Sequence, residues 1–326
     1  MGLDLFRRWD TVLHGVKVLT VGGRSDDFFL HEGVDMLHCN AMVPLTTEEI
    51  RAVVQHALAE DLGSGDVTTL ATVPESATMR AVMKARESLV PAGLAISEAA
   101  FHEVSAAVKV QRIATDGVPV KPGQDLMRIE GSARAILSAE RVALNFAQRL
   151  SGVATLTAQF VEAIKGTKAK ILDTRKTTPG LRRFEKYAVA CGGGHNHRIG
   201  LYDMVLIKDN HLAALRDESP NAIAVAVQRA RKQYPQLQVE VEADTLEQVE
   251  QALAAKADIV LLDNMTLIQL RLAVQNAKGR AQTEASGGIN LASIRAVAET
   301  GVDYISVGAL THSARAVDIG LDFDEV

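Results

Sequence analysis

The chain has 326 residues, of which 47% are apolar, 23% are charged and 4% are aromatic. This composition is typical of a soluble globular protein, and the length allows two domains or one barrel with an appendage. The low aromatic content and the sequence pI near 6.0 argue against nucleic-acid binding. No uncharged apolar run approaches the ~20 residues that span a bilayer, so we expect no membrane partner.

The two cysteines and the N-terminal segment carry little functional signal. Cys39 and Cys191 share no spacing typical of a metal or redox site. Two isolated cysteines indicate a reducing compartment, and we therefore expect a cytoplasmic protein. Residues 1–41 contain basic side chains but no apolar core followed by a small-residue cleavage site. We interpret them as an N-terminal extension of unknown role rather than a secretory signal.

Residues 42–143 are predicted to form a small α+β domain. Thr46–Glu49 has the form of a capping box, and apolar residues recur after it at helical spacing. The elements expected next are, in chain order, a turn-rich loop at 60–69, a strand at 78–90, a helix at 94–106 and a strand at 108–130. A long helical region follows from Ser138 to about residue 165, with an interruption predicted around Ser151 and Gly152.

Strands and helices alternate from residue 169 onward, which predicts a parallel sheet. The expected strands are AKILDT, DMVLIKD, LQVEVEA, DIVLLDN, RAQTEAS and DYISVGA, and the expected later helices are 219–233, 245–256, 266–278 and 290–300. The expected N-caps are Thr245, Thr266 and Asn290, and the expected C-cap glycines are Gly279 and Gly301. The regular strand spacing favours a TIM-like α/β barrel, incomplete or irregular, over an open sheet. We assign 144–311 to this catalytic barrel and 312–326 to the smaller domain.

Polar residues or glycines follow all six predicted strands of the barrel. They are Asp173 to Lys176, Lys208 to Asn210, Glu242, Asp263 and Asn264, Ser286 to Gly288, and Gly308 with Ala309. Barrel enzymes carry their chemistry at the C-terminal strand ends because all the βα loops converge there. The sequence therefore predicts a functional site at this end of the barrel.

The segment from Asp173 to Asn210 is a cationic cluster in an acidic protein. Between its flanking aspartates it holds seven basic residues and only two acids, while the whole chain carries a net charge of −5. The basic residues are Arg175, Lys176, Arg182, Arg183, Lys186, Arg198 and Lys208. Such a cluster indicates a site for a compact polyanion. Arginine grips a carboxylate or phosphate with a planar fork, and lysine acts as a mobile point charge.

Two glycine-rich loops, at 284–290 and 306–313, follow the last two predicted strands. Glycine lets backbone N–H groups approach a phosphate closely, and a helix N-terminus adds a favourable dipole. We interpret the two loops as a monophosphate site for a sugar phosphate. The alternative is that they are tight turns without a ligand.

Carboxylates end two adjacent predicted strands. Glu242 and Asp263 are placed to hold Mg²⁺ through water or to bind ribose hydroxyls. Alternatively, one of them caps the next helix or pairs with Lys208. Glu240 shares the facing of Glu242, so it is either the functional acid itself or a deeper partner of a buried base.

His195 and His197 have a spacing that occurs in metal sites. No third histidine or cysteine lies nearby, and Arg198 would repel a cation. Hydrogen bonding to an anionic substrate is therefore favoured for His197. The chain contains no G-x-S-x-G elbow, Walker motif or dinucleotide fingerprint.

Ten motifs in order resemble those of a known family. They are EDLGSGDVTT, ERVALNFAQRLSGVAT, DTRKTTPGLR, EKYAV, GGGHNHRIGLYD, LIKDNH, VEVEA, LLDN, EASGGI and YISVGALTHS. Over about residues 44–323 the chain resembles the quinolinate phosphoribosyltransferases, the decarboxylating nicotinate-nucleotide pyrophosphorylases of NAD synthesis. The resemblance implies transfer of phosphoribose from phosphoribosyl pyrophosphate (PRPP) to quinolinate with loss of CO₂, and Mg²⁺ as the cofactor. The N-terminal extension is the one departure.

The resemblance also implies roles for individual residues. Substrate binding falls to Arg141, Arg175, Lys176, His197, Arg198, Lys208, Glu242, Asp263, Ser286, Gly287 and Gly308. Lys176, Lys208, Glu242 and Asp263 are implied to be catalytic, and the two acids to hold Mg²⁺ indirectly. Arg141 is otherwise a solvated helix charge. The resemblance implies that it enters the site of a neighbouring subunit, which makes a homodimer with shared sites.

Three other functions compete with this interpretation. A phosphoribosyltransferase for nicotinate would bind one carboxylate and need fewer cations than this chain offers. A barrel aldolase needs a Schiff-base lysine in a less cationic pocket, whereas Lys208 lies among arginines. A non-catalytic sensor would keep the phosphate loops but lose the acids, and Glu242 and Asp263 are both present.

Overall fold

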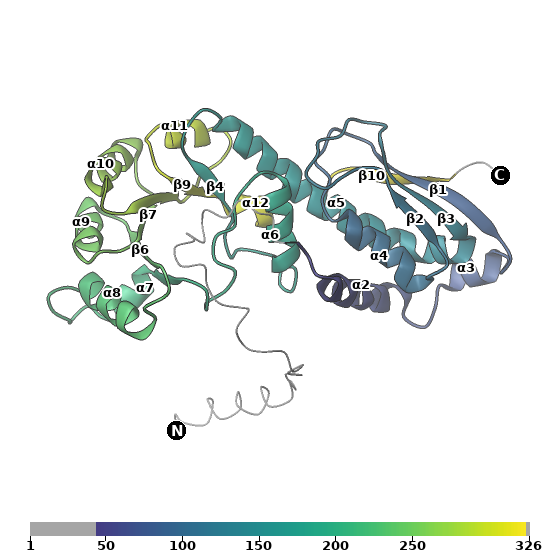
Figure 1. Ribbon diagram of the computed structural model, residues 1–326, viewed down its shortest axis with the longest axis horizontal. Coiled ribbons are helices and arrows are strands. Elements are labelled where there is room, and N and C mark those ends of the chain that lie inside the picture. Colours follow the sequence, from purple (N-terminus) through teal and green to yellow (C-terminus); the bar gives the residue numbers. More distant parts are fainter. Residues whose placement is uncertain (1–43, 324–326) are drawn as a thin grey trace, which may run out of the picture. The chain divides into compact units, whose positions relative to one another are not determined.

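The computed structural model describes residues 44–323, which form two sheets and the helices around them (Figure 1). The predicted extension at 1–41, with Cys39, lies outside the described residues. The first sheet has four strands in the order β10-β1-β3-β2, and the second has six strands in the order β4-β9-β8-β7-β6-β5.

The four-stranded sheet belongs to the smaller α+β unit. Its strands are β1 (Thr78–Ala85), β2 (Lys109–Arg112), β3 (Asp125–Ser132) and β10 (Ile319–Phe323), all antiparallel to their neighbours. Its helices are α2 (Thr47–Leu62), α3 (Val67–Thr72) and α4 (Leu94–Val104). The C-terminal strand β10 lies beside β1 (Figure 1), so the end of the chain returns to the unit in which the described residues begin.

Side-chain caps set the helix starts in this unit. The capping box predicted at Thr46 is confirmed, since its hydroxyl accepts from Glu49 N at 3.1 Å and the Glu49 carboxylate accepts from Thr46 N at 2.8 Å. The prediction of a loop throughout 60–69 is wrong, because α3 begins inside that segment. Asp66 caps it by accepting a hydrogen bond from Thr69 N at 3.0 Å.

One long helix, α5 (Ala133–Ala163), runs without a break through the predicted interruption. Ser151 and Gly152 are buried in its interior and make close contacts there. The Ser151 hydroxyl accepts from Ala92 N at 3.0 Å. A Cβ at Gly152 would lie 2.0 Å from the backbone oxygen of Arg315. The prediction of a break was wrong because this glycine serves a close approach between distant segments.

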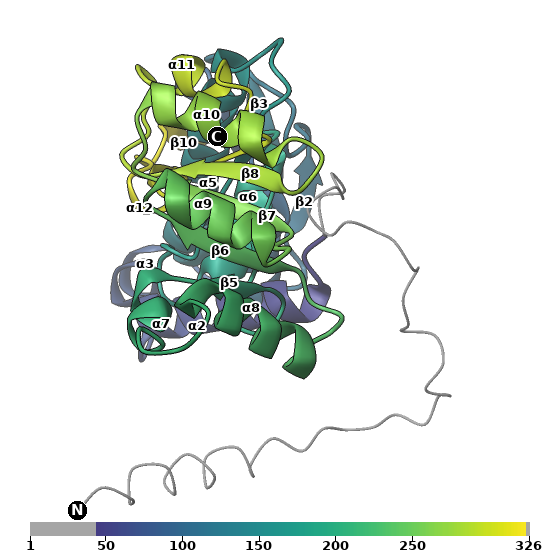
Figure 2. The same cartoon turned by 90° about the vertical axis from the view of Figure 1, so that its left-hand side faces the viewer.

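The six-stranded sheet is parallel throughout. Its strands are β4 (Lys170–Leu172), β5 (Val205–Ile207), β6 (Val239–Ala243), β7 (Ile259–Asp263), β8 (Gln282–Ser286) and β9 (Tyr304–Ser306). Its helices are α6 (Arg182–Cys191), α7 (Asp209–Ala213), α8 (Ala222–Gln233), α9 (Leu246–Ala254), α10 (Leu267–Ala277), α11 (Ile294–Ala298) and α12 (Ala309–His312). Helices α8, α9 and α10 contact the sheet on the face turned toward the viewer in Figure 2.

All six strands predicted after residue 169 are therefore confirmed, as is an incomplete α/β barrel beside a smaller α+β unit. The sheet stays open between its edge strands β4 and β5. Only a single parallel bridge, Leu172 to His195, extends it on the β4 side within the described residues.

The predicted caps of the later helices are confirmed at two of three positions. Thr245 and Thr266 form capping boxes with Gln248 and Gln269. Asn290 is not the N-cap of α11, since turn residues 291–293 come between. Its side chain accepts from backbone N–H groups in that turn instead.

Membrane-spanning character is absent from the described helices. Within residues 44–323, no helix combines the length and the apolar character needed to cross a bilayer.

The close contact at Gly152 predicts that even a methyl group is not tolerated there. On an exposed helix Gly→Ala stabilises by about 1 kcal/mol. In Gly152→Ala the added carbon would overlap a backbone oxygen, and we expect a net loss of about 1–3 kcal/mol in the free energy of unfolding, as for other overpacked cores. Urea unfolding measures this loss.

The matched control is Asn145→Ala, an exposed position on the same helix. It should stay within about 0.5 kcal/mol of the parent chain. A Gly152→Ala protein as stable as this control would show that the two segments do not meet as described.

Candidate active site

The C-terminal ends of the parallel strands bring predicted site residues together. Residues two apart on a strand share a face, so Glu240 and Glu242 of β6 point the same way. Strand register sets Asp263 of β7 beside Ser286 of β8. Lys208, directly after β5, forms an ion pair with Glu242 across the neighbouring strand. Of the alternatives considered for Glu242, pairing with Lys208 is the one observed.

Five of the seven cations of the segment 173–210 have partners among the described residues. Lys208 pairs with Glu242, and Arg198 donates from Nη1 to Met204 O at 3.2 Å. Lys186 is fully buried, forms an ion pair with Asp173 and donates to the backbone oxygen of His197 at 2.8 Å. Arg183 binds Glu49 at 2.9 Å. Arg182 donates to Thr177 Oγ1 and to Ile199 O, both at 3.0 Å. The cations that remain candidates for a ligand are Arg175, Lys176, Arg198 and Lys208, and of these Arg198 and Lys208 already have a partner in the protein.

Arg175 and Arg198 lie close enough to influence each other electrostatically. Burial, together with the Arg175 charge, lowers the pKa of the Arg198 guanidinium. Arg175 Nε is buried and has no hydrogen-bond partner among the described residues. Two cations held side by side repel each other, and a ligand with two negative charges relieves that repulsion. The pair therefore suits a dianion.

The two glycine-rich loops differ in their surroundings. Gly287 adopts φ +96°, and a Cβ there would lie 2.1 Å from Asn264 Oδ1. A Cβ at Gly308 would lie 3.2 Å from Lys176 Cδ and 3.1 Å from His312 Nε2. The side chain of Lys176 thus packs against the β9 loop. A cation that was predicted to bind substrate therefore lies beside a predicted phosphate loop.

Two neighbours of these loops were given no individual role by the sequence analysis, although Asn264 was named among the polar residues at the strand ends. His312 is exposed and sits beside Gly308, and its place in the motif SVGALTHS was the only signal for it. Asn264 adopts φ +52° and donates to Asp263 at 2.6 Å. A left-handed non-glycine residue at a strand end is typical of functional sites. Both residues are candidate ligands of a phosphate or sugar.

His197 lies below the strand ends rather than among the exposed cations. Its side chain is 7% exposed, and Nε2 lies 3.1 Å from Glu240 Oε2 and 3.4 Å from Glu284 Oε2. Nδ1 accepts from Arg198 N at 2.7 Å. Both ring nitrogens are engaged by the protein itself. Glu240 is therefore the deeper partner of a buried base, and Glu284, which the sequence analysis missed, is a second one.

Arg141 is not joined to these strand ends by any contact of its own chain. It lies on the exposed side of α5, and its side chain makes no hydrogen bond or ion pair with the described residues.

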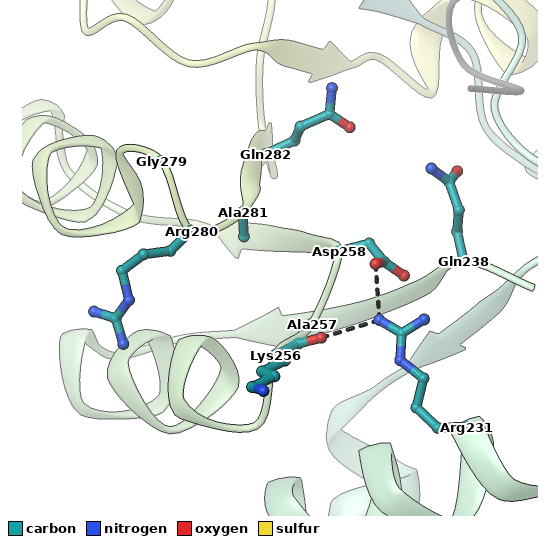
Figure 3. Close-up of a pocket in the computed structure, with 9 residues that line it drawn as sticks. All are labelled: Arg231, Gln238, Lys256, Ala257, Asp258, Gly279, Arg280, Ala281 and Gln282. Atoms are coloured by element: carbon teal, nitrogen blue, oxygen red, sulfur yellow. Dashed lines mark hydrogen bonds and ion pairs between the residues drawn. The ribbon is translucent and has the colours of Figure 1, made fainter. Parts of the chain in front are cut away.

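A hollow lies at the N-terminal ends of the strands, opposite the predicted site residues (Figure 3). Its volume is about 770 Å³. Arg231 crosses it to bind Asp258 at 2.7 Å and the backbone oxygen of Lys256 at 3.0 Å. Arg231 and Asp258 satisfy each other here, and N-terminal strand ends do not carry chemistry in barrel enzymes. The C-terminal end is therefore the candidate active site.

Known proteins are similar to this chain over most of its length. A Mycobacterium leprae protein named nicotinate-nucleotide pyrophosphorylase (carboxylating) is 46% identical over 278 residues, which are 83% of this chain and 96% of that protein. An Arabidopsis thaliana protein of the same name, chloroplastic, is 41% identical over 294 residues, covering 85% and 84%. The solved nicotinate-nucleotide pyrophosphorylase of Francisella tularensis matches with a TM-score of 0.82 at 40% identity, covering 87% of this chain and 99% of that one.

Two family models decide the assignment. The N-terminal domain of quinolinate phosphoribosyl transferase matches residues 66–151, and the C-terminal domain of the same family matches 153–322. The chain belongs to the quinolinate phosphoribosyltransferase family. It is therefore an enzyme, a transferase of pentosyl groups. The two matched regions meet inside α5, next to Gly152.

In this member of the quinolinate phosphoribosyltransferase family, His197, Glu240 and Glu284 form a buried layer. The charges of these three side chains shift one another's pKa values. Burial raises the pKa of Glu240, and the charge of Glu284 raises it further, to about 7. Burial lowers the pKa of His197, but the charges of Glu284 and Glu240 outweigh it and raise that pKa to about 10. The contact from Arg198 N favours a neutral ring, yet a neutral hydrogen bond contributes only about 1 kcal/mol. Two buried carboxylates outweigh it, and we assign His197 as an imidazolium.

The same layer has the spacing of a metal site. The His197 nitrogen and one oxygen of each glutamate lie within 4.8 Å of one another. The positively charged imidazole of His197 already balances the two glutamates. The nearby guanidinium groups would repel a metal ion bound there. Mg²⁺ fits better at Glu242 and Asp263, whose oxygens end adjacent strands and are the hard ligands that it prefers.

The charge on His197 predicts a pH effect. Because its folded-state pKa is raised above 6.5, its contribution to stability is full below pH 6.5 and is lost as the pH rises through 10. In ¹⁵N-histidine NMR of the native protein, we expect one imidazole to stay charged at about pH 8.5, where ordinary histidines are neutral.

His197→Gln is the control for this assignment, since the signal should be missing from its spectrum. Titration of all nine histidines below about pH 8 would contradict the charged layer.

Proposed function

We propose that this chain transfers the phosphoribosyl group of PRPP to the ring nitrogen of quinolinate. The products are nicotinate mononucleotide, pyrophosphate and CO₂, and the reaction serves NAD biosynthesis. The observation that carries the proposal is the pair Arg175 and Arg198, two guanidinium groups whose charges are close enough to interact. A pair of cations suits an acceptor with two carboxylates better than one with a single carboxylate.

The two substrates divide the site between the strand ends. Arg175, Arg198 and Lys208 bind the carboxylates of quinolinate. Lys176, which packs against Gly308, serves the anionic donor. Ser286, Gly287 and Gly308 bind its 5-phosphate through backbone N–H groups, as glycine-rich loops after barrel strands do.

His197 contributes to this site from below. Its imidazole is held by Glu240 and Glu284, and its neighbour Arg198 carries the charge toward the substrate. The family resemblance implies that His197 binds substrate. We propose that it does so indirectly, by holding Arg198 in place.

The acids of the site serve the ribose and the metal. Glu242 and Asp263 would hold Mg²⁺, which neutralises the departing pyrophosphate when bound. Glu242 is already paired with Lys208, so binding of quinolinate exchanges one partner of Lys208 for another. The same acids stabilise positive charge that develops on the ribose.

The reaction needs positioning and charge neutralisation from the protein. The pyridine nitrogen attacks C1 of the ribose as the bond to pyrophosphate breaks, through a transition state with oxocarbenium character. The resulting pyridinium accepts the electron pair of the breaking carbon–carbon bond, so the 2-carboxylate leaves as CO₂. A proton takes its place on the ring. Lys176 and Lys208 are the residues placed to stabilise the leaving and entering charges.

We propose further that the active form is a homodimer in which Arg141 completes the partner's site. Arg134 and Ser138 anchor α3 through Leu70 O and Asp66, at 3.4 and 3.0 Å. Arg141 follows them at helical spacing and shares their face of α5. Its uncommitted guanidinium therefore lies beside α3 and is available to a second chain.

Exposed apolar side chains support such an interface. Val67 and Leu70 on α3 are 74% and 54% exposed, and Leu201 and Tyr202, just after Arg198, are 74% and 75% exposed. Large exposed apolar side chains are often covered by a partner in an assembly.

A cytoplasmic location is also proposed. Its support is the described cysteine, Cys191, which is buried. Burial raises the pKa of its thiol to about 12, which keeps it in the unreactive form.

The reaction is tested with quinolinate, PRPP and Mg²⁺. We expect CO₂ and nicotinate mononucleotide to appear in equal amounts. Arg175→Ala should abolish turnover while keeping the parent circular dichroism spectrum, because its side chain binds substrate and packs little. Turnover of nicotinate in place of quinolinate would refute the proposed acceptor. A folded chain that forms no product with either acceptor would refute the proposed phosphoribosyl transfer.

The shared site is tested by subunit mixing. Arg141→Ala and Lys208→Ala homodimers should each be inactive. Hybrid dimers carry one site with both lesions and one with neither, so up to half of the parent activity per hybrid should return. Subunit exchange is verified with two affinity tags. Exchange without recovered activity would contradict the contribution of Arg141 from a partner.

A further inference from the structure

A buried glutamate behind the β4–α6 loop ties that loop to the barrel. Glu185 on α6 is 0% exposed. Its Oε1 accepts from Thr178 Oγ1 at 2.7 Å, and its Oε2 accepts from Thr178 N at 3.0 Å. The backbone is therefore fixed two residues after Lys176, in the loop that also carries Arg175.

A single arginine joins this glutamate to the other side of the site. Arg149 on α5 donates from Nη2 to Glu185 Oε1 at 2.8 Å and from Nη1 to Ala314 O at 2.6 Å. Nη2 also donates to the backbone oxygen of Thr311. The planar guanidinium thus holds α12 and the turn after it, which follow the glycine of the β9 loop.

Thr311 closes the connection. Its buried hydroxyl donates to Lys176 O at 2.8 Å and reaches Gly308 O at 3.2 Å. The contacts form a ring that runs from Lys176 through Thr178, Glu185, Arg149 and Thr311 back to Lys176. This ring joins the loop of the acceptor cations to the loop of the 5-phosphate.

The ring contains no group free to meet a substrate. Both carboxylate oxygens of Glu185 accept hydrogen bonds, and both terminal nitrogens of Arg149 donate to protein groups. A buried carboxylate is tolerated when it is paired and hydrogen-bonded in this way. What the ring determines is the distance between two substrate-binding loops.

We propose that Glu185, Arg149 and Thr311 are positioning residues that hold the β4 loop and the β9 loop at the spacing that phosphoribosyl transfer requires. The inference rests on the proposed function, because the two loops bind different substrates in it. The nitrogen of the acceptor and C1 of the donor must meet at reacting distance, and a displacement of ~1 Å can lower a rate by ~100-fold. Breaking the ring should therefore lower kcat more than it raises either KM.

Thr311→Val tests this with little change of shape, because a methyl group replaces the hydroxyl. We expect kcat to fall about 10-fold, with each KM within about 3-fold of the parent value, as expected when reacting groups are misaligned rather than unbound. Thr311→Ser keeps the hydroxyl and should restore kcat. Glu185→Gln puts an amide donor against Thr178 N or Arg149, and we expect a loss of about 100-fold.

The matched control is Thr300→Val. Thr300 is also a buried threonine that donates to a backbone oxygen, Val297 O at 2.6 Å, but it precedes β9 at the opposite end of the sheet. Its kcat should equal that of the parent chain. Melting temperatures of all variants separate a loss of fold from a loss of alignment.

A double variant gives the sharpest result. If Glu185 and Thr311 belong to one ring, Glu185→Gln with Thr311→Val should be no worse than Glu185→Gln alone. Independent, multiplying losses would overturn the ring, as would a folded Thr311→Val enzyme with the parent kcat. A silent parent enzyme would overturn the proposed function, and this inference with it, whereas an active parent with unaffected variants would overturn only the inference.

Discussion

The buried carboxylate of Asp173 organises the loops on which the site depends. It directly follows β4, pairs with Lys186, and accepts from Asn196 Nδ2 at 2.7 Å and from His197 N at 2.8 Å. Burial raises its pKa against the pull of Lys186. Such a pair adds little net stability, but removing one partner leaves an uncompensated charge. Its structural effect is to fold the glycine-rich segment before His197 back onto β4, and this sets the direction of Arg198.

Much of the architecture could be predicted because its causes are local. Alternating strand and helix patterns marked all six parallel strands. The capping box at Thr46 and the N-caps Thr245 and Thr266 were also predicted correctly. The failures came from contacts between distant residues. Gly152 was interpreted as a helix break, although its role is to meet the backbone of Arg315. A local pattern contains no information about a segment 163 positions further along the chain.

The candidate site shows the same limit. Counting charges found the cationic segment but could not tell structural cations from those available to a ligand. Only the fold buries Lys186 against Asp173 and leaves Arg175 half-buried. The acid Glu284 stands in a motif interpreted as a phosphate loop, and its partner His197 is 87 positions earlier. Glu240 was ambiguous for the same reason. Strand periodicity gives the direction of its side chain, but the identity of the group it meets depends on the tertiary fold.

The buried layer of His197, Glu240 and Glu284 explains how the cations of the site are held in place when no substrate is bound. Arg175 and Arg198 repel each other, and Glu240 beneath them supplies a charge that favours the charged form of Arg198. Because the buried carboxylates and His197 are ordered by folding, the guanidinium groups need little rearrangement when a dianion arrives. Preorganised charge of this kind stabilises a transition state more than flexible charge does. The acids Glu242 and Asp263 lie nearer the C-terminal ends of their strands. Position along the strand thus separates the buried carboxylates of Glu240 and Glu284 from the acids that we propose for the reaction.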